Sequence, residues 1–238
     1  MQIETQMAQL RLHGMGRNWK AMLETHRHNE LSLEDGLEIL LQSEILDREN
    51  RRFDRLQKSA RFRYQASIEE IVFDTSRGLD KSQVSQLITG EYITKGEPVL
   101  ITGATGCGKS FLASALGHHA CAQGHKVTYY NVQKLLIKTK MARLDGTIYK
   151  LFEQLAKTDL LVMDDFGLTH LEKQQQMDLM EIIEDRHARK ATIIASQLPV
   201  SSWYNIIGEE TIADAILDRL VHTSHRIELK GESLRKKM

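Results

Sequence analysis

The spacing of apolar residues changes character near residue 66. Before it, apolar positions recur at helical intervals, and a first helix is expected over residues 7–26. A second helix is expected after Ser32, because Ser32-x-x-Asp35 resembles a capping box with Asp in place of Glu. Its apolar stripe comprises Leu37, Leu40, Leu41, Ile45, Leu46, Phe53, Leu56 and Ala60. The pattern predicts a small all-helical domain over residues 1–66.

From Pro98 onward, short apolar runs alternate with helical patterns. Strands are expected at 99–102, 126–130, 159–163, 191–195 and 225–229. Helices are expected at 109–122, 132–143, 148–157, 172–189 and 212–222. Continuous apolar strands separated by helices are typical of a parallel sheet covered on both faces. We therefore predict a second, α/β domain over residues 67–238, with residues 66–90 as a link.

Composition narrows the function classes. The chain has 238 residues, of which 41% are hydrophobic and 27% charged, as in an ordinary globular protein. No apolar run approaches the roughly 18 residues of a membrane helix, and the first residues lack the apolar core of a secretory signal. Two cysteines build neither a disulfide framework nor a four-cysteine zinc site. These features predict a cytoplasmic protein with no membrane partner.

A glycine-rich turn follows the first predicted strand. Residues 103–110 read Gly-Ala-Thr-Gly-Cys-Gly-Lys-Ser and fit the phosphate-loop pattern G-x-x-x-x-G-K-[ST]. The glycines permit close approach to phosphates, and the loop and helix N–H groups offer donors to an anion. Lys109 is expected to contact the β- and γ-phosphates of ATP, and Ser110 the accompanying Mg²⁺. The predicted ATP-binding residues are Gly103, Ala104, Thr105, Gly106, Cys107, Gly108, Lys109, Ser110 and Phe111.

Two acidic residues end the third predicted strand. Asp164 is expected to hold Mg²⁺, and Asp165 to orient or deprotonate the attacking water. The alternative is an Asp-rich turn after a strand. If the fourth strand lies between the first and third, Ser196 and Gln197 at its end lie beside the γ-phosphate. Gln197 is then the expected contact to the γ-phosphate and water, unless it is only a turn residue before Pro199.

The order of these motifs resembles a known family. GATGCGKSFLA, LLVMDDFG, IIASQLP and AILDRL look like the DnaC/IstB group of AAA+ ATPases, and EILLQSEILDRENRRFDRLQKSARF looks like the helical front of IstB. The resemblance covers essentially the whole chain. It implies a P-loop three-layer parallel sheet, an AAA+ core, preceded by the small all-helical domain. Because little sequence follows the fifth strand, no full helical lid is expected.

The resemblance also implies roles. IstB-like proteins are ATPases that bind DNA, self-assemble on it and deliver a target site to a transposase. In this family pattern Arg219 matches an arginine finger that reaches a neighbouring subunit's nucleotide, although it can also be read as a solvated helix arginine. Asp165 and Gln197 replace the usual Glu and Asn, which predicts slow hydrolysis. Arg226 and Arg235 are the candidates for a second sensor arginine.

Basic residues form two candidate DNA-binding sets, although 32 basic and 32 acidic residues balance overall. The first set lies at i, i+3, i+4 and i+7 on one helix face: Arg48, Arg51, Arg52 and Arg55, extended by Lys58. The second set comprises Lys134, Lys138, Lys140 and Arg143. Either set can instead be a solvated face, the first with internal pairs to Asp47, Glu49 and Asp54. Binding through phosphates predicts little sequence preference.

The predicted function is an ATP-dependent, duplex-DNA-binding helper of an insertion-sequence transposase. It is expected to act as a homo-oligomer with active sites at subunit interfaces, and hydrolysis is expected to drive disassembly. The alternative is a DnaC-like replicative helicase loader, which predicts a single-stranded DNA preference and a helicase partner. A small-molecule kinase is disfavoured, because no substrate lid or acceptor site is visible.

Overall fold

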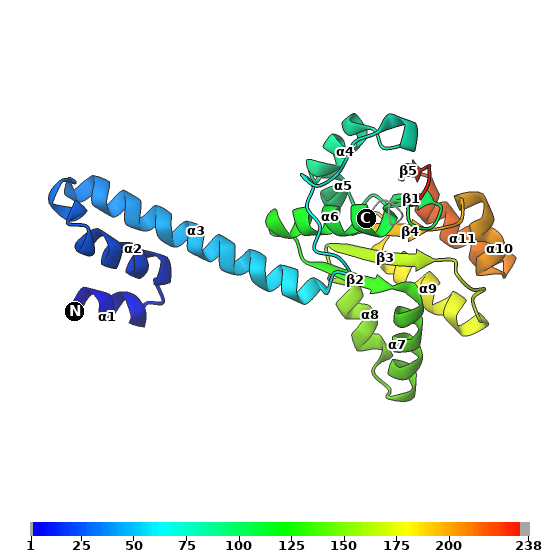
Figure 1. Ribbon diagram of the computed structural model, residues 1–238. Helices are drawn as coiled ribbons and strands as arrows, with labels where there is room; N and C mark the ends of the chain where they lie inside the picture. The colour runs from blue at the N-terminus through cyan, green and yellow to red at the C-terminus, as the bar shows by residue number, and fades with distance from the viewer. Residues whose placement is uncertain (1, 234–238) are drawn as a thin grey trace. The chain divides into compact units, whose positions relative to one another are not determined.

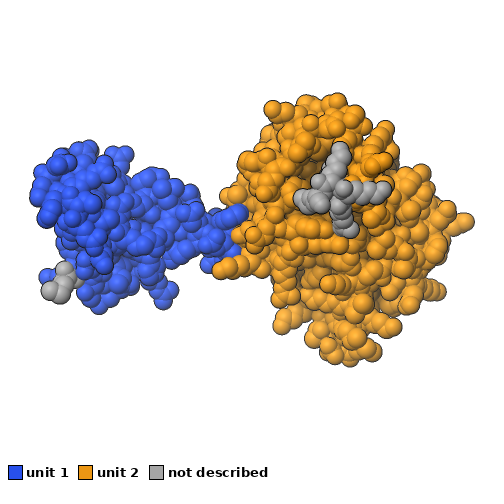
Figure 2. Space-filling model, viewed as in Figure 1, with its two compact units in different colours: residues 1–55 blue, residues 56–238 orange. Residues whose placement is uncertain are grey.

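The computed structural model describes residues 2–233. The chain divides into two compact units, residues 1–55 and 56–238 (Figure 2). The division falls within helix α3 (Leu33–Ala60), whereas the composition change placed the boundary at residue 66. The last turn of α3 and the segment after it pack with the second unit, as shown by the 3.1 Å distance between Gln57 Nε2 and His118 Nδ1.

The first unit contains helices α1 (Gln2–Gln9) and α2 (His13–Glu24), the 3₁₀ turn η1 (Arg27–Asn29) and most of α3 (Figure 1). The single helix expected over 7–26 is therefore wrong. Arg11 adopts a left-handed φ of 58°, and the N–H of Leu12 bonds back to Met7 O at 2.8 Å. This geometry resembles a Schellman ending, in which a left-handed residue terminates the helix and satisfies its last carbonyls.

The segment expected to be a link is instead partly helical. Within residues 66–90 it contains η2 (Thr75–Arg77) and α4 (Lys81–Ile88), and α5 (Glu91–Lys95) follows directly. The Asp80 side chain caps α4 by accepting from Ser82 N at 3.0 Å. These helices have eight and five residues, too few turns to display a clear apolar period.

The second unit is built on a five-stranded sheet in the order β2-β3-β4-β1-β5, with every pair parallel. The strands are β1 (Val99–Gly103), β2 (Val127–Asn131), β3 (Leu160–Phe166), β4 (Ala191–Ser196) and β5 (His225–Leu229). All five lie where apolar runs were found in the sequence. The expected placement of β4 between β1 and β3 is confirmed. The carboxyl ends of β1, β3 and β4 therefore meet at one edge of the sheet.

Helices cover both faces of the sheet, which confirms the three-layer arrangement (Figure 1). They are α6 (Lys109–Ala122), α7 (Val132–Leu144), α8 (Ile148–Ala156), α9 (Lys173–Arg186), α10 (Trp203–Ile207) and α11 (Glu210–Val221), with η3 (Val200–Ser202) before α10. Side chains of α7, α8, α9 and α11 form one core with Leu100, Leu161, Met163 and Ile194 of the sheet. In Figure 1, α6 lies on the opposite face.

Only a short loop, up to Ser233, follows β5 in the described part of the chain. Among residues 2–233, no helix is both long enough and apolar enough to cross a membrane.

Candidate active site

The phosphate loop joins the end of β1 to the start of α6. Gly103, Gly106 and Gly108 have φ values of 144°, 85° and 101°, which side-chain-bearing residues rarely adopt. A Cβ on Gly103 would lie 2.1 Å from Leu229 O. Gly108 is the N-cap of α6 and supplies no side chain, so the first N–H groups of this helix remain available to an anion.

Lys109 lies inside the loop. Its ammonium donates to Ala104 O at 2.8 Å, and the residue is only 6% exposed. The thiol of Cys107 donates to the same carbonyl at 2.6 Å. The loop therefore concentrates a positive charge beside its backbone, while Phe111 is half-buried on the first turn of α6.

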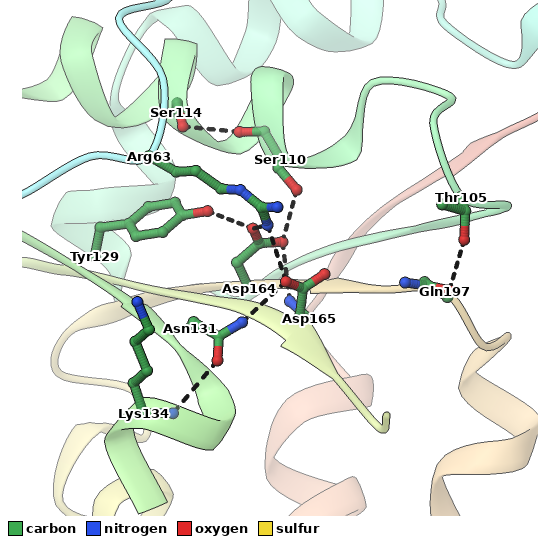
Figure 3. Close-up of polar contacts among 10 residues, drawn as sticks. All are labelled: Arg63, Thr105, Ser110, Ser114, Tyr129, Asn131, Lys134, Asp164, Asp165 and Gln197. Carbon is green, nitrogen blue, oxygen red and sulfur yellow. Dashed lines mark hydrogen bonds and ion pairs between the residues drawn. The ribbon is translucent and has the colours of Figure 1, made fainter. Parts of the chain in front are cut away.

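Ser110 and Asp164 are brought together from α6 and β3. Ser110 Oγ donates to Asp164 Oδ1 at 3.0 Å (Figure 3). Asp164 is 1% exposed. A hydroxyl and a buried carboxylate next to a phosphate loop are hard oxygen ligands, which suit Mg²⁺ carried by nucleotide phosphates. The donor set therefore fits that ion.

A β-bulge places the second carboxylate. Met163 pairs with Ile194, but Phe166 pairs with Ser196, so β3 has one extra residue between these two positions. Asp165 lies in the bulge with a φ of 59°. Successive side chains of a regular strand point to opposite faces, whereas a bulge re-aims them. Consequently the carboxylates of Asp164 and Asp165 both contact the guanidinium group of Arg63 (Figure 3).

The end of β2 orients Asp165. Asn131 is opposite Asp164 in the parallel register, and its Nδ2 donates to Asp165 Oδ2 at 2.9 Å. The same side chain caps α7, because Asn131 Oδ1 accepts from Lys134 N at 3.3 Å. One residue thus fixes both the carboxylate and the neighbouring helix. Its place after an apolar run was visible in the sequence, but its role depends on β2 lying beside β3.

Two further residues were missed by sequence reasoning. Tyr129 donates its hydroxyl to Asp164 Oδ2 in a short hydrogen bond. Burial, together with the bond to Asp164, raises the pKa of Tyr129, so the phenol remains a donor. Arg63 Nη1 lies 3.3 Å from Asp164 Oδ2 and 2.9 Å from Asp165 Oδ2. No motif in the sequence marks Arg63, which lies outside the β/α pattern.

Gln197 follows β4 and contacts the phosphate loop. Its Oε1 accepts from Thr105 Oγ1 at 2.7 Å (Figure 3). The preceding Ser196 is fully buried and donates to Phe166 O at 2.8 Å. The ends of β3 and β4 are therefore tied together, and Gln197 lies next to the loop as its sequence position indicated.

The other predicted arginines lie away from these carboxylates. Arg219 Nε is 2.5 Å from Glu184 Oε2 on α9, and its Nη1 donates to Ala215 O at 2.8 Å. Arg226 is in the first half of β5 and donates to Val221 O at 3.0 Å, near the opposite end of this strand from the phosphate loop. A second-sensor role for Arg226 therefore does not fit this geometry, because parallel strands bring their carboxyl ends to the loop. Arg235 lies outside the described residues.

Two arginines of the first basic set form ion pairs with acidic residues of the same helix. Arg48 Nε lies 2.7 Å from Glu44, and Arg51 Nε lies 2.6 Å from Asp47. Both acidic side chains are buried against α2, so these two arginines stabilise the helix pair. Of the partners weighed from the sequence, Asp47 is used in this way. Arg52, Arg55 and Lys58 complete the set along α3.

The second basic set lies on α7. Arg143 forms an ion pair with Asp178 of α9, and this hydrogen bond raises the pKa of Arg143 despite the opposing effect of burial. Lys138 Nζ donates to Tyr130 Oη at 2.6 Å. Lys134 and Lys140 are exposed. The two exposed lysines are therefore the members best placed to meet a polyanion.

Known proteins are similar to this chain in sequence, in fold or in both. The model of the IstB-like ATP binding protein family matches residues 5–238. A protein of Sinorhizobium fredii named as an insertion sequence ATP-binding protein is 43% identical over 225 residues, covering 94% of this chain and 92% of the relative. The corresponding protein of insertion sequence IS1162 from Pseudomonas fluorescens is 38% identical over 199 residues, covering 83% and 86%.

Solved structures with low sequence identity share the fold alone. The DnaC helicase loader aligns with a TM-score of 0.56 and 20% identity over 70% of this chain and 98% of that structure. AMPPCP-bound DnaA from Aquifex aeolicus aligns with a TM-score of 0.58 and 17% identity over 74% and 53%. Together with the assembled phosphate loop and carboxylates, the match over nearly the whole sequence shows that this chain is an AAA+ ATPase and belongs to the IstB-like ATP-binding protein family, whose members are associated with insertion sequences.

Proposed function

We propose that the chain is an ATP-dependent DNA-binding helper of an insertion-sequence transposase. The observation that carries this proposal is the Ser110–Asp164 contact beside the phosphate loop, in a chain whose relatives are named insertion sequence ATP-binding proteins. ATP binding closes a homo-oligomer on duplex DNA, the assembly presents the target to the transposase, and hydrolysis releases it.

The geometry supports the following chemical roles. Ser110 and Asp164 hold Mg²⁺, which neutralises phosphate charge when bound. Lys109 leaves Ala104 O and binds the β- and γ-phosphates. Asp165, oriented by Asn131, accepts a proton from or aligns the attacking water. Hydrolysis is expected to be slow, because an aspartate reaches less far than a glutamate.

Two side chains extend the site beyond these carboxylates. Gln197 contacts the γ-phosphate and water from the Thr105 side of the loop. Arg219 is proposed to reach the nucleotide of a neighbouring subunit, after exchanging its contact with Glu184 for the phosphate. A finger supplied in trans makes hydrolysis depend on assembly. Active sites then lie at the interfaces of the oligomer.

Duplex DNA is proposed to contact the basic sets of α3 and α7. The contacts are to phosphates, which position the protein without reading sequence. The main DNA contacts are proposed to be Lys134, Lys140, Arg55 and Lys58. A cognate transposase is the expected protein partner, consistent with the insertion-sequence relatives.

Size-resolved binding tests the function directly. The full chain is mixed with a random duplex or a single strand of equal length, in ATP, in ADP and without nucleotide. We expect large complexes on duplex DNA in ATP that dissociate in ADP. Lys109→Ala should abolish nucleotide binding and assembly, whereas Lys157→Gln, an exposed lysine paired with Glu153, should behave as the wild type.

A helicase loader is the second candidate, because DnaC has a similar fold. It predicts preference for single strands and no nucleotide-dependent growth on duplex DNA. That result, together with capture of a purified replicative helicase in place of a transposase, would replace the first proposal.

A further inference from the structure

Arg63 is the one cation that the described residues place on both active-site carboxylates. Its Nη1 is 2.9 Å from Asp165 Oδ2 and 3.3 Å from Asp164 Oδ2 (Figure 3). The two carboxylate oxygens of Asp164 have different partners. Oδ1 accepts from Ser110, and Oδ2 accepts from Arg63 and Tyr129. The guanidinium bonds to the same carboxylate that is proposed to bind the metal.

The position of Arg63 is fixed by its neighbours in sequence. Phe62 stacks on His118 of α6 with ring centroids 4.2 Å apart. A Cβ on Gly117 would lie 2.4 Å from Phe62 Cε1, so only glycine admits this ring so close to α6. His118 Nε2 donates to Tyr64 O at 3.2 Å. Residues on both sides of Arg63 are thus anchored to the helix that begins with Lys109.

We propose that Arg63 is a resident counter-ion that competes with Mg²⁺ for the Asp164–Asp165 pair, so that the metal displaces it when nucleotide binds. The proposal rests on the metal role assigned above to Asp164. Two positive charges cannot occupy the same carboxylates without strong repulsion in a partly buried site. The side chain of Arg63 is 41% exposed whereas that of Asp164 is 1% exposed, so the guanidinium can move toward water while the carboxylate stays.

The guanidinium group of Arg63 carries a permanent positive charge. Arginine stays protonated in proteins, and the guanidinium of Arg63 lies within hydrogen-bond distance of both carboxylates. A permanent charge at this place prevents the carboxylates from repelling each other before the metal arrives. The cost is weaker binding of Mg²⁺, which must first break the contacts of Arg63.

Metal affinity, measured without turnover, tests this proposal. Mn²⁺ serves as a probe for the Mg²⁺ site, and its binding to the full, nucleotide-free chain is followed by electron paramagnetic resonance. We expect Arg63→Gln to bind Mn²⁺ about tenfold more tightly than the wild type, because a competing charge is removed. Arg61→Gln, an exposed arginine in the same segment, is the matched control and should not change the affinity.

A second readout uses a fluorescent ADP analogue with Mg²⁺ or with EDTA. The gain in nucleotide affinity on adding Mg²⁺ should be larger in Arg63→Gln than in the wild type. Arg63→Lys keeps the charge and should stay near the wild type. An unchanged or weaker metal affinity in Arg63→Gln, or equal gains in the Gln and Lys variants, would overturn the competition.

The metal assignment is tested separately from Arg63. Asp164→Asn should remove the Mg²⁺-dependent gain in both the wild-type and the Arg63→Gln background. If the wild type itself shows no such gain, the metal role of Asp164 fails. If the wild type shows the gain and Arg63→Gln does not enlarge it, only the role of Arg63 fails.

Discussion

A single backbone irregularity decides the chemistry at the residue scale. Without the bulge in β3, Asp164 and Asp165 would point to opposite faces of the sheet. Asp tolerates the left-handed φ of 59° better than most residues, because its short polar side chain bonds locally. The bulge lets one carboxylate stay with Ser110 while the other faces Asn131.

Replacing Asp165 by Asn should separate binding from hydrolysis. The amide keeps the shape of the side chain but cannot accept a proton, so we expect ATP binding within a few-fold of wild type and turnover lowered by about 10²–10⁴. Binding is measured with a fluorescent ATP analogue and turnover by phosphate release. Asp145→Asn, at the exposed end of α7, is the control. Normal hydrolysis in Asp165→Asn would show that this carboxylate is wrongly assigned.

His118 makes stability depend on pH. Its Nε2 donates to Tyr64 O, so Nδ1 is left to accept from Gln57 Nε2 at 3.1 Å, which requires the neutral ring. Burial lowers the pKa of His118 below its ordinary value, although the bond to Tyr64 opposes the shift. The folded state therefore binds fewer protons here than the unfolded chain. The neutral His118 ring therefore contributes to the stability of the folded state above the ordinary histidine pKa. This contribution is lost as the pH falls from there through the lower pKa of the folded state.

Melting temperatures at about pH 7.5 and about pH 5.5 check this dependence. The wild type should lose more stability on acidification than His118→Gln, which has no proton to gain in this range. His222→Gln, on an exposed histidine, should respond to acidification like the wild type. Equal losses in the wild type and His118→Gln would contradict the neutral-ring assignment.

At the scale of elements, the packing of α2 on α3 depends on one small residue and one buried acid. A Cβ on Gly14 would lie 2.3 Å from Ser43 O. Glu44 of α3 accepts from the N–H groups of Gly14 and Met15 at 2.7 and 3.2 Å, and so caps α2 in place of a local side chain. Burial opposes ionisation of Glu44, yet Arg48 and these two amides lower its pKa overall.

Gly14→Ala should destabilise the helix pair. Alanine favours a helix over glycine by about 1 kcal/mol, but here its methyl group would clash with the backbone of α3. Gly36→Ala is the matched control, because nothing lies within 4 Å of its Cβ in the same helix pair. We expect a lower melting temperature for Gly14→Ala and a slightly higher one for Gly36→Ala, both followed by circular dichroism of the full chain. A stabilised Gly14→Ala variant would refute the close approach.

At the scale of the whole molecule, charge placement matters more than charge balance. Equal numbers of basic and acidic residues say nothing about DNA binding. Arg48, Arg51 and Arg143 are paired with buried or nearly buried acids. We therefore propose that DNA phosphates are bound chiefly by the exposed lysines of α7 and by the basic residues in the last turns of α3.

The salt dependence of duplex binding tests that assignment. We expect Lys134→Gln with Lys140→Gln, or Arg55→Gln with Lys58→Gln, to weaken binding and make the logarithmic salt slope shallower by about 0.9 for each DNA phosphate that the variant no longer neutralises. Lys95→Gln with Lys157→Gln, the control, removes two exposed lysines that pair with Glu91 and Glu153. An unchanged slope in both test variants, equal to that of the control, would place the DNA elsewhere on the chain.

The strands, most of the α/β helices, the phosphate loop and the family could all be predicted from the amino-acid sequence. Those features are local: apolar runs, glycine spacing and a strand followed by two acids. The helix break at Arg11 and the short helices α4 and α5 were not predicted from the sequence, because a left-handed residue or a helix of five to eight residues leaves little periodic signal.

The side chains that surround the carboxylates could be identified only from the folded chain. Arg63 lies 101 residues before Asp164 in the chain, and Tyr129 lies 35 before it. Their approach depends on strand order, on the bulge in β3 and on Phe62 packing against Gly117. The bulge, the pairing of β2 with β3 and the Phe62 contact are not encoded in residue spacing, because contacts between distant segments arise from packing the elements together. The motifs therefore predict where phosphate and metal bind, whereas the contact of Arg63 with both carboxylates emerges only from the folded chain.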